Sequence, residues 1–206
     1  MTVKATVKPS EGHVSVGIDL GLKTTATCSD GFVFERRRIT DEFAQQLATA
    51  QRANKTKQIK SIYAKIKHSR SDAIHKFTTH MTDKYGAIFV GDVSSKKLVK
   101  TKMAKSVLDS GWGMLKTQLE YKAIARSVVF AEVNEKYTTQ VCSHCLEISD
   151  NSPKGRTGLR IREWFCALCN TWHDRDVNAA GNVLRLGHQS LVVGISVLSA
   201  QAVTVR

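Results

Sequence analysis

The sequence has no apolar run long enough to cross a membrane and no apolar segment at its N-terminus. The most apolar stretch, Leu191 to Val203, covers about 13 residues, whereas a helix that spans a bilayer needs about 20. The first residues, MTVKATVKPSEG, lack the apolar core of a secretory signal peptide. These absences argue against a membrane-bound or secreted protein, and we expect a protein of the cytoplasm with no membrane partner.

The sequence also has few acidic residues. The 206 residues include 18 Asp and Glu but 31 Lys and Arg, which leaves a formal net charge of +13. Such a basic chain is typical of proteins that bind polyanions, although charge of one sign can also serve solubility alone. We expect a partner that carries many phosphates, as DNA and RNA do.

No acidic residue occurs between Phe43 and Ser71, a segment with a helical pattern of apolar residues. Apolar residues such as Ile62 and Ile66 recur at spacings of three and four within a helix expected over about 41–82. A solvated helix face usually mixes both signs of charge, so a face of one sign favours contacts with phosphates over a merely solvated surface. The candidate nucleic-acid-binding residues are Lys57, Lys60, Lys65, Lys67 and Arg70.

Four of the five cysteines form two Cys-x-x-Cys pairs, Cys142 with Cys145 and Cys166 with Cys169. Twenty residues separate the pairs, a spacing typical of zinc ribbons. Because there is no secretion signal, metal ligation explains these cysteines better than disulfides do. Four thiolates complete a tetrahedral site without an open position, so we expect structural Zn²⁺, with iron as the minor alternative. Cys28, inside a predicted strand, is expected to be a small core residue.

The order of predicted elements indicates an α/β fold. Strands at 13–19, 24–29 and 32–39 follow one another with short turns and predict an antiparallel meander. The later elements are the helix over 41–82, a buried strand at 86–93, a helix at about 103–126, a buried strand at 127–133 and a helix at 174–186. This order is that of a ribonuclease-H-like mixed sheet with flanking helices and an inserted four-cysteine ribbon.

The same pattern suggests how the chain is divided, since no internal repeat or low-complexity stretch is present. We expect the first part of the sheet domain at 13–140, the ribbon at 141–172 and the final helix of the sheet domain at 173–187. Residues 188–206 form a tail, which either packs as a last strand or trails from the domain.

Three aspartates lie where a two-metal nuclease needs carboxylates. Asp19 ends the first predicted strand, in GIDLG, and Asp174 and Asp176 open the last helix. Cleavage of a phosphodiester between two Mg²⁺ ions requires several carboxylates that converge on ions about 3.5–4 Å apart. Asp19 alone could be an ordinary turn residue and one later acid could cap the helix, but a cap does not need both.

Several motifs occur in a fixed order: GIDLG, GDVSS, YTTQ-x-Cys-x-x-Cys, a second Cys-x-x-Cys and HDRDVNAA-x-N-x-L. From about residue 13 to residue 187 this order resembles the TnpB family of bacterial insertion sequences, whose relatives include type V CRISPR effectors and Fanzor proteins. The resemblance implies a RuvC-like, Mg²⁺-dependent DNA endonuclease that is guided by RNA and encoded by a transposable element. It also implies DNA and guide RNA as partners in full-length relatives, together with a transposase encoded by the same element.

By motif position, Asp19 corresponds to the first catalytic aspartate of the family and Asp176 to the last, with Asp174 as a rival for the last role. Most relatives carry a catalytic glutamate where this sequence has Gly91, and glycine has no side chain to bind a metal. The resemblance therefore leaves one carboxylate of the site to be found elsewhere.

Three explanations for Gly91 compete. Asp92 could take the role, although neighbouring residues of a strand point to opposite faces. The domain could bind nucleic acid without cleaving it. Alternatively Glu135, with Glu132 as the second choice, could supply the carboxylate, as in the rearranged sites of Fanzor-like relatives. We favour the last explanation, with Asp19, Glu135 and Asp176 as catalytic residues that hold Mg²⁺.

Two further expectations concern the N-terminal end of the chain and three residues of the ribbon. Full-length relatives carry an N-terminal region that holds guide RNA and target DNA, whereas this chain begins about a dozen residues before its first strand. The alternative to an active nuclease is therefore a truncated or catalytically inactive DNA- or RNA-binding protein. In the ribbon, Arg160, Arg162 and Trp164 either add phosphate and stacking contacts or are ordinary surface and core residues.

Overall fold

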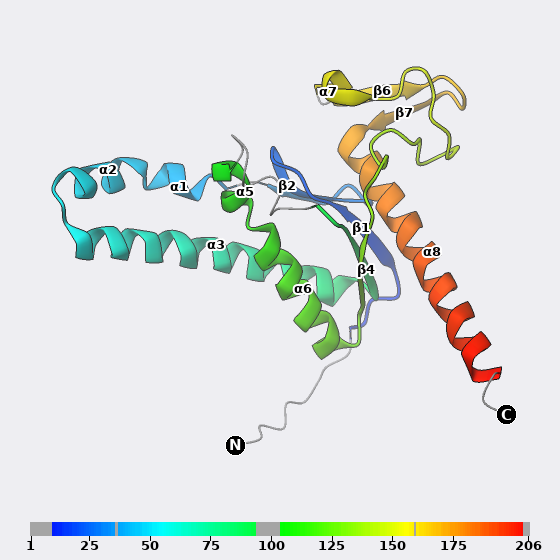
Figure 1. Ribbon diagram of the computed structural model, residues 1–206, viewed down its shortest axis with the longest axis horizontal. Helices are drawn as coiled ribbons and strands as arrows, with labels where there is room; N and C mark the ends of the chain where they lie inside the picture. Colours follow the sequence, from blue (N-terminus) through cyan, green and yellow to red (C-terminus); the bar gives the residue numbers. More distant parts are fainter. Residues whose placement is uncertain (1–9, 36, 94–103, 159, 204–206) are drawn as a thin grey trace.

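The computed structural model (Figure 1) describes residues 10–35, 37–93, 104–158 and 160–203. At its centre lies a five-stranded sheet in the order β3-β2-β1-β4-β5. Strand β2 runs antiparallel to both of its neighbours, β1 and β3, while β4 runs parallel to β1 and β5 runs parallel to β4. The predicted mixed α/β sheet with an antiparallel meander is therefore confirmed. The strands are β1 (Ser15–Asp19), β2 (Thr24–Cys28), β3 (Val33–Glu35), β4 (Ala87–Gly91) and β5 (Val129–Val133).

The two edges of the sheet differ from expectation. Strand β5 was predicted to be buried, but it is an edge strand in which only Val133 is buried and Val129 is 41% exposed. An apolar run predicts a strand but does not indicate whether that strand lies at the edge or in the middle of the sheet. At the other edge, β3 ends at Glu35 and is shorter than the predicted 32–39, of which residue 36 lies outside the described residues.

The basic segment forms a helical hairpin, here called the arm, which projects from the sheet (Figure 1). Instead of one helix over 41–82, it contains α1 (Ile39–Glu42), α2 (Ala44–Arg52) and the first half of α3 (Thr56–Lys84). The chain reverses at Asn54, whose φ of +49° lies in the left-handed region that asparagine tolerates better than most residues. The arm has a small apolar core of its own, formed by Ile39, Ala50, Ile62 and Ile66.

The helix predicted at about 103–126 is broken in two. It consists of α5 (Ala104–Ser110) and α6 (Trp112–Arg126), and residue 103 lies outside the described residues. Gly111 separates them with a φ of +64°, and a Cβ there would lie 2.8 Å from Cδ1 of Ile74 on α3. The break therefore depends on a residue that accepts positive φ and leaves room for the neighbouring helix.

Helices cover both faces of the sheet, and alternate residues of β4 show which helices they are. Ile88 and Val90 belong to the main core with residues of α3 and α6, whereas Ala87 and Phe89 pack with Val183 of α8 (Arg175–Val203). The main core also contains Cys28, whose side chain is fully buried, as predicted.

Helix α8 lies so close to the sheet that neither Gly17 on β1 nor Gly187 on α8 leaves room for a side chain. A Cβ on Gly17 would stand 2.1 Å from the carbonyl oxygen of Ala180, and a Cβ on Gly187 would stand 2.1 Å from the ring of Phe89. The helix continues well beyond the predicted 174–186, to Val203, so residues 188–203 are helical and form no strand. The expected division at residue 187 thus falls within one helix, and residues 204–206 lie outside the described part.

The cysteine ribbon lies at the N-terminal end of α8 (Figure 1). Its strands β6 (Glu163–Cys166) and β7 (Thr171–Asp174) form an antiparallel hairpin beside the short α7 (Gly155–Gly158). Because α8 begins at the residue after β7, the ribbon is joined directly to the helix that packs on the sheet. Within the described residues, no helix combines the length and the apolar character needed to pass through a bilayer.

Candidate active site and cysteine metal centre

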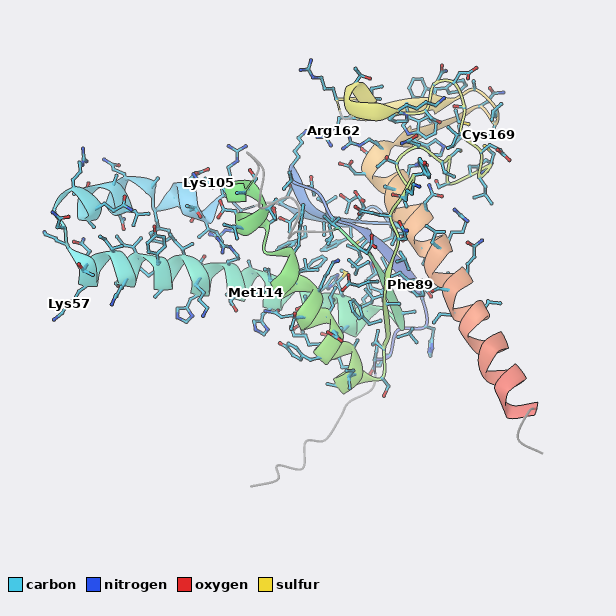
Figure 2. The ribbon with its side chains drawn as sticks, in the orientation of Figure 1. Lys57, Phe89, Lys105, Met114, Arg162 and Cys169 are labelled. Carbon is cyan, nitrogen blue, oxygen red and sulfur yellow. The ribbon has the colours of Figure 1, made fainter. Side chains whose placement is uncertain are left out.

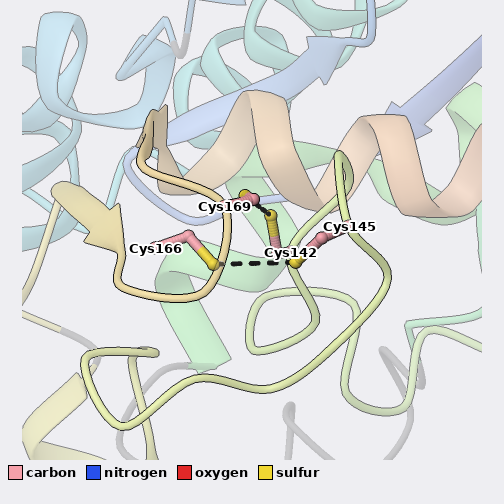
Figure 3. A group of neighbouring side chains, drawn as sticks. All are labelled: Cys142, Cys145, Cys166 and Cys169. Carbon is pink, nitrogen blue, oxygen red and sulfur yellow. Dashed lines mark hydrogen bonds between the residues drawn. The ribbon is translucent and has the colours of Figure 1, made fainter.

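Four cysteines meet inside the ribbon (Figure 3). Their sulfur atoms all lie within 4.8 Å of one another, and none of the four cysteines forms a disulfide: Cys142, Cys145, Cys166 and Cys169. The Sγ–Sγ distance is 3.6 Å between Cys142 and Cys169, and 3.7 Å between Cys145 and Cys166. Tetrahedral ligation with metal–sulfur distances of about 2.3 Å would separate the sulfurs by about 3.8 Å. The cluster therefore fits a metal ion such as zinc and leaves no open position for a substrate.

A histidine that the sequence did not suggest lies beside this cluster. Nε2 of His173 is 3.0 Å from Sγ of Cys142, and the His173 ring packs against Trp164 with 4.8 Å between centroids. Trp164 is only 3% exposed and lies in the core of the ribbon, so it is not available to stack on a base. The exposed indole of the ribbon belongs to Trp172, at 70%.

Three carboxylates from separate parts of the chain line one open cleft of about 490 Å³. Asp19 is the last residue of β1, Glu135 follows the end of β5, and Asp176 lies in the first turn of α8. Because β1 and β5 both run parallel to β4, their carboxyl ends meet at the same edge of the sheet. The cleft lies where open α/β sheets usually bind their ligands.

Glu135 occupies the space that the missing side chain at residue 91 would take. Gly91 ends β4, and an ideal Cβ built on it would lie 2.8 Å from Oε2 and 3.4 Å from Cβ of Glu135. A side chain at residue 91 would therefore require the carboxylate of Glu135 to move.

The cleft strongly disfavours a charged Asp19. Burial and, after it, the negative charges of Asp176 and Glu135 together raise the pKa of Asp19 to about 7, while Arg175 opposes the shift. The pKa of Glu135 is also raised, mainly by burial and then by the charge of Asp92, with Lys116 opposing. These pKa shifts indicate that the cleft holds too little positive charge to balance its carboxylates.

Asp176, by contrast, has two arginine partners. Nη1 of Arg162, from the ribbon, lies 2.9 Å from Oδ2 of Asp176, and Arg175 places Nε and Nη2 at 2.9 and 2.6 Å from Oδ1. Among the described residues, only the four cysteines form a group of three or more possible metal ligands that all lie within 4.8 Å of one another. Asp19, Glu135 and Asp176 thus share a cleft but do not yet converge on one point.

Asp174, the rival of Asp176, has a different role. Its Oδ1 accepts hydrogen bonds from the backbone N–H groups of Asp176 at 2.9 Å and Val177 at 2.8 Å. This geometry is that of a helix N-cap, and Asp174 does not line the cleft.

Comparison with known proteins identifies relatives of this chain. Residues 1–102 match the OrfB_IS605 model, described as a probable transposase, and residues 112–183 match the Cas12f1-like TNB domain. A Streptomyces pristinaespiralis protein named "Putative RNA-guided DNA endonuclease" is 29% identical over 197 residues, which cover 88% of this chain and 48% of that protein. InsQ of Escherichia coli K12, named in the same way, is 27% identical over 227 residues, with coverages of 97% and 55%.

The chain is similar to TnpB-type transposon proteins in both of its halves. It spans about half the length of the curated relatives it matches. A solved Cas12f1–sgRNA–target DNA complex has a similar structure, with a TM-score of 0.62 and 17% identity over 89% of this chain and 52% of that one. At this identity the match establishes the shared fold alone, and it confirms the predicted RuvC-like architecture.

Asp92 and Glu132 are the other candidates for the catalytic glutamate of TnpB proteins. Asp92 is exposed, and its Oδ1 lies 3.4 Å from the backbone nitrogen of Glu135. Glu132 is also exposed and pairs with Lys116, with 2.5 Å between Oε2 and Nζ. Neither acid is among the residues that line the cleft.

Four of the five residues predicted to bind nucleic acid are exposed on α3: Lys57, Lys60, Lys65 and Lys67. Figure 2 shows Lys57 at the far end of the arm. Arg70 differs, because its Nη2 is 2.8 Å from Oδ1 of Asp109 and its side chain is only 19% exposed. The Arg70–Asp109 ion pair attaches α3 to α5, so Arg70 is engaged within the protein. On the ribbon, Arg160 is exposed whereas Arg162 is bound to Asp176.

Proposed function

We propose that this chain forms the RuvC-like nuclease domain of a TnpB-type, RNA-guided DNA endonuclease and that Asp19, Glu135 and Asp176 hold its catalytic Mg²⁺. The observation that carries the proposal is the meeting of these carboxylates in one cleft at the carboxyl edge of the sheet. Carboxylate oxygens are the ligands that Mg²⁺ prefers in proteins. The raised pKa of Asp19, at about 7, is the electrostatic situation that a divalent cation would relieve.

The substitution of Glu135 for the family's glutamate is part of this proposal. It is supported by the carboxylate of Glu135 lying 2.8 Å from where a Cβ at residue 91 would stand. Asp92 and Glu132 are weaker candidates because neither lines the cleft.

When bound, Mg²⁺ would activate a water molecule and stabilise the leaving oxygen of the phosphodiester. The residues of the chain supply the binding and the orientation. Asp19 and Glu135 must be ionised to act as ligands, and Asp176 must exchange part of its contact with Arg162 and Arg175. Lys23 and the two arginines line the same cleft and provide positive charge for the phosphates of a nucleic acid.

We further propose that the ribbon binds structural Zn²⁺. The support is the pair of Sγ–Sγ distances, 3.6 and 3.7 Å, close to those of tetrahedral zinc–thiolate sites. Apart from the residues around the cysteines, the ribbon has little core: Cys142, Trp164 and Cys166 make up its buried apolar cluster. The ion would therefore contribute to the folding of the ribbon directly.

DNA is the proposed substrate and guide RNA the proposed partner. Relatives named for RNA-guided endonuclease activity support both, as does the net charge of +13. The exposed lysines of the arm are proposed to contact the sugar–phosphate backbone. A transposase encoded by the same element remains a proposed partner on the basis of the family alone.

The test is cleavage of labelled single- and double-stranded DNA by the whole chain in Mg²⁺, with and without RNA co-purified from its host. Asp19→Ala removes a proposed ligand, and Asp72→Ala removes an exposed carboxylate of α3 as a matched control. Cleavage that Asp19→Ala abolishes and Asp72→Ala preserves supports the nuclease. Salt-sensitive binding without cleavage under every condition would instead favour a catalytically inactive nucleic-acid-binding protein.

A further inference from the structure

Two buried asparagines on α8 bind the chain segment that follows Glu135. Asn178 and Asn182 are one helical turn apart and are 2% and 1% exposed. Both donate from Nδ2 to the same two carbonyl oxygens, those of Thr138 and Val141. The distances are 3.2 and 2.8 Å from Asn178 and 2.9 and 2.7 Å from Asn182. This double bridge attaches the turn to the helix at two points.

The turn itself, residues 135–141, is closed by hydrogen bonds that lead back to Glu135. The carbonyl oxygen of Glu135 accepts from the backbone N–H of Thr138 at 3.1 Å and from its hydroxyl at 2.8 Å. The N–H groups of Gln140 and Val141 both donate to the carbonyl of Tyr137 at 2.9 Å. Thr138 therefore stands between Glu135 on one side and the two asparagines on the other.

The helix end of this connection carries another proposed ligand. Asp176 lies two residues before Asn178, in the first turn of α8. A continuous set of hydrogen bonds thus links the backbone of Glu135, through Thr138, to the helix whose first turn contains Asp176. Asn178 also accepts at Oδ1 from the N–H of Ser143 at 2.8 Å, next to the first cysteine of the ribbon.

The asparagines are not required merely to hold α8 on the sheet. That packing is already made through Gly17 against Ala180 and through Phe89 against Gly187. Oδ1 of Asn182 is buried and has no hydrogen-bond partner among the described residues. Only the donor of Asn182 is therefore in use, and it is directed at the turn.

We propose that Asn178 and Asn182 are positioning residues of the nuclease site, which hold the 135–141 turn so that the Glu135 carboxylate stands over Gly91 and faces the ligands on β1 and α8. This inference rests on the proposed function, because it assumes that Glu135 is a metal ligand. Groups that orient metal ligands commonly change metal affinity by about 10- to 100-fold when removed.

The experiment measures Mn²⁺ binding to the whole chain by electron paramagnetic resonance in a double-mutant cycle. Asn182→Leu removes the donor and keeps the number of heavy side-chain atoms, Glu135→Gln removes the carboxylate, and the double variant combines them. Gln189→Leu makes the same kind of change on the exposed side of α8 and serves as the control. If Asn182→Leu does not fold, Asn182→Ser takes its place.

We expect Asn182→Leu to weaken Mn²⁺ binding about tenfold or more in the native background. In the Glu135→Gln background it should have little further effect, since the ligand it positions is already absent. Equal losses in both backgrounds, or no loss in either, would overturn the positioning role. Gln189→Leu should bind Mn²⁺ as the native chain does.

Amide hydrogen exchange separates this proposal from the proposed function. If Mn²⁺ binding by the native chain does not depend on Asp19, the proposed metal site is wrong. Hydrogen exchange still tests whether the asparagines hold the turn. Asn182→Leu should speed exchange at Thr138, Gln140 and Val141 about tenfold while the amides of β1 and β4 keep their rates. A uniform increase through the whole domain, or no change in the turn, would show that Asn182 does not hold this segment.

Discussion

The carboxylate of Glu135 lies 2.8 Å from the point at which Gly91 would carry a Cβ, so a side chain at residue 91 would compete with Glu135 for this part of the cleft. Gly91 belongs to β4 and is fixed by the sheet, whereas Glu135 lies in the turn after the neighbouring strand β5. The register pairs Gly91 with Val133, two residues before Glu135. A carboxylate can therefore reach the same space from either strand.

This relationship predicts that the carboxylate can be moved between the strands. Glu135→Ala should abolish Mg²⁺-dependent cleavage or reduce it by at least about 100-fold, because a site of three carboxylates loses one ligand. Gly91→Glu alone should also be harmful, since the new side chain meets Glu135. The double variant Gly91→Glu with Glu135→Ala should recover part of the activity, measured as cleavage rate and Mn²⁺ affinity. Full activity in Glu135→Ala would contradict the assignment.

The elements that the sequence allowed us to predict are those that local patterns specify. Alternating residues and short turns predicted β1 and β2, and the paired Cys-x-x-Cys motifs predicted the sulfur cluster. Asp19 and Asp176 were found because each lies in a motif of adjacent residues. The arm was predicted as helical but not as a hairpin, since its reversal depends on Asn54 and on packing of Ile39 against α3.

What the sequence did not reveal depends on contacts between distant segments. Arg162 and Asp176 lie on opposite sides of the ribbon hairpin in sequence, and their ion pair follows from the pairing of β6 with β7. Arg70 looks like any other basic residue of the arm until the fold brings Asp109 against it. The targets of Asn178 and Asn182 are backbone carbonyls, which no residue type marks.

The raised pKa of Asp19 predicts a pH dependence of the metal-free chain. Asp19 titrates near 3.8 when unfolded and near 7 when folded, so the folded state binds this proton more tightly. Its stabilising contribution is complete below the lower value and is lost as the pH rises through 7. Relative to Asp19→Asn, the free energy of unfolding of the native chain should fall by about 2–4 kcal/mol between pH 4 and pH 8, at 1.36 kcal/mol per unit.

Metal affinity should follow the opposite course. A ligand must lose its proton before it binds a cation, so Mn²⁺ affinity should rise up to about tenfold per pH unit below 7 and level off above it. Denaturation curves in EDTA and Mn²⁺ titrations across this range test both parts. A native chain whose stability follows that of Asp19→Asn at every pH would show that Asp19 is not perturbed.

Arg162 should compete with a metal ion for Asp176. Its Nη1 is 2.9 Å from Oδ2 of Asp176, and a cation bound to that oxygen must displace it. Because the pair is partly exposed and worth at most about 1 kcal/mol, Arg162→Ala should strengthen Mn²⁺ binding only a few-fold. Arg160→Ala, at the exposed arginine nearby, is the control and should leave the affinity unchanged. Weaker Mn²⁺ binding in Arg162→Ala would instead mean that Arg162 organises the site.

Removing the metal from the ribbon should unfold the ribbon without unfolding the sheet. The ribbon's buried apolar cluster is the set of residues around the cysteines, whereas the sheet has its own large core. Metal analysis should give one Zn²⁺ per chain, and Cys166→Ser or strong chelation should release it. The fluorescence of Trp164 should then shift to the red as its indole becomes exposed. Cys28→Ser should retain the metal, because Cys28 lies in the sheet core.

The exposed lysines of the arm should set the salt dependence of nucleic-acid binding. Replacing all four with glutamine (Lys57→Gln, Lys60→Gln, Lys65→Gln and Lys67→Gln) removes positive charge without touching the arm's apolar core. Each phosphate contact contributes about 0.9 to the slope of log affinity against log salt for duplex DNA. The slope should therefore become shallower by up to about 3.6, and affinity in low salt should fall by at least about 100-fold.

The matching variant in which the same four lysines become arginine keeps the charge and should keep the slope. Zinc content and the helical circular dichroism signal should be unchanged in both variants, since these side chains are exposed and the core of the arm is intact. If the glutamine variant binds DNA and RNA with the native slope, the basic face of α3 is only a solvated surface. The phosphate contacts must then lie elsewhere, and the next residues to replace are those of the cleft, Lys23, Arg162 and Arg175.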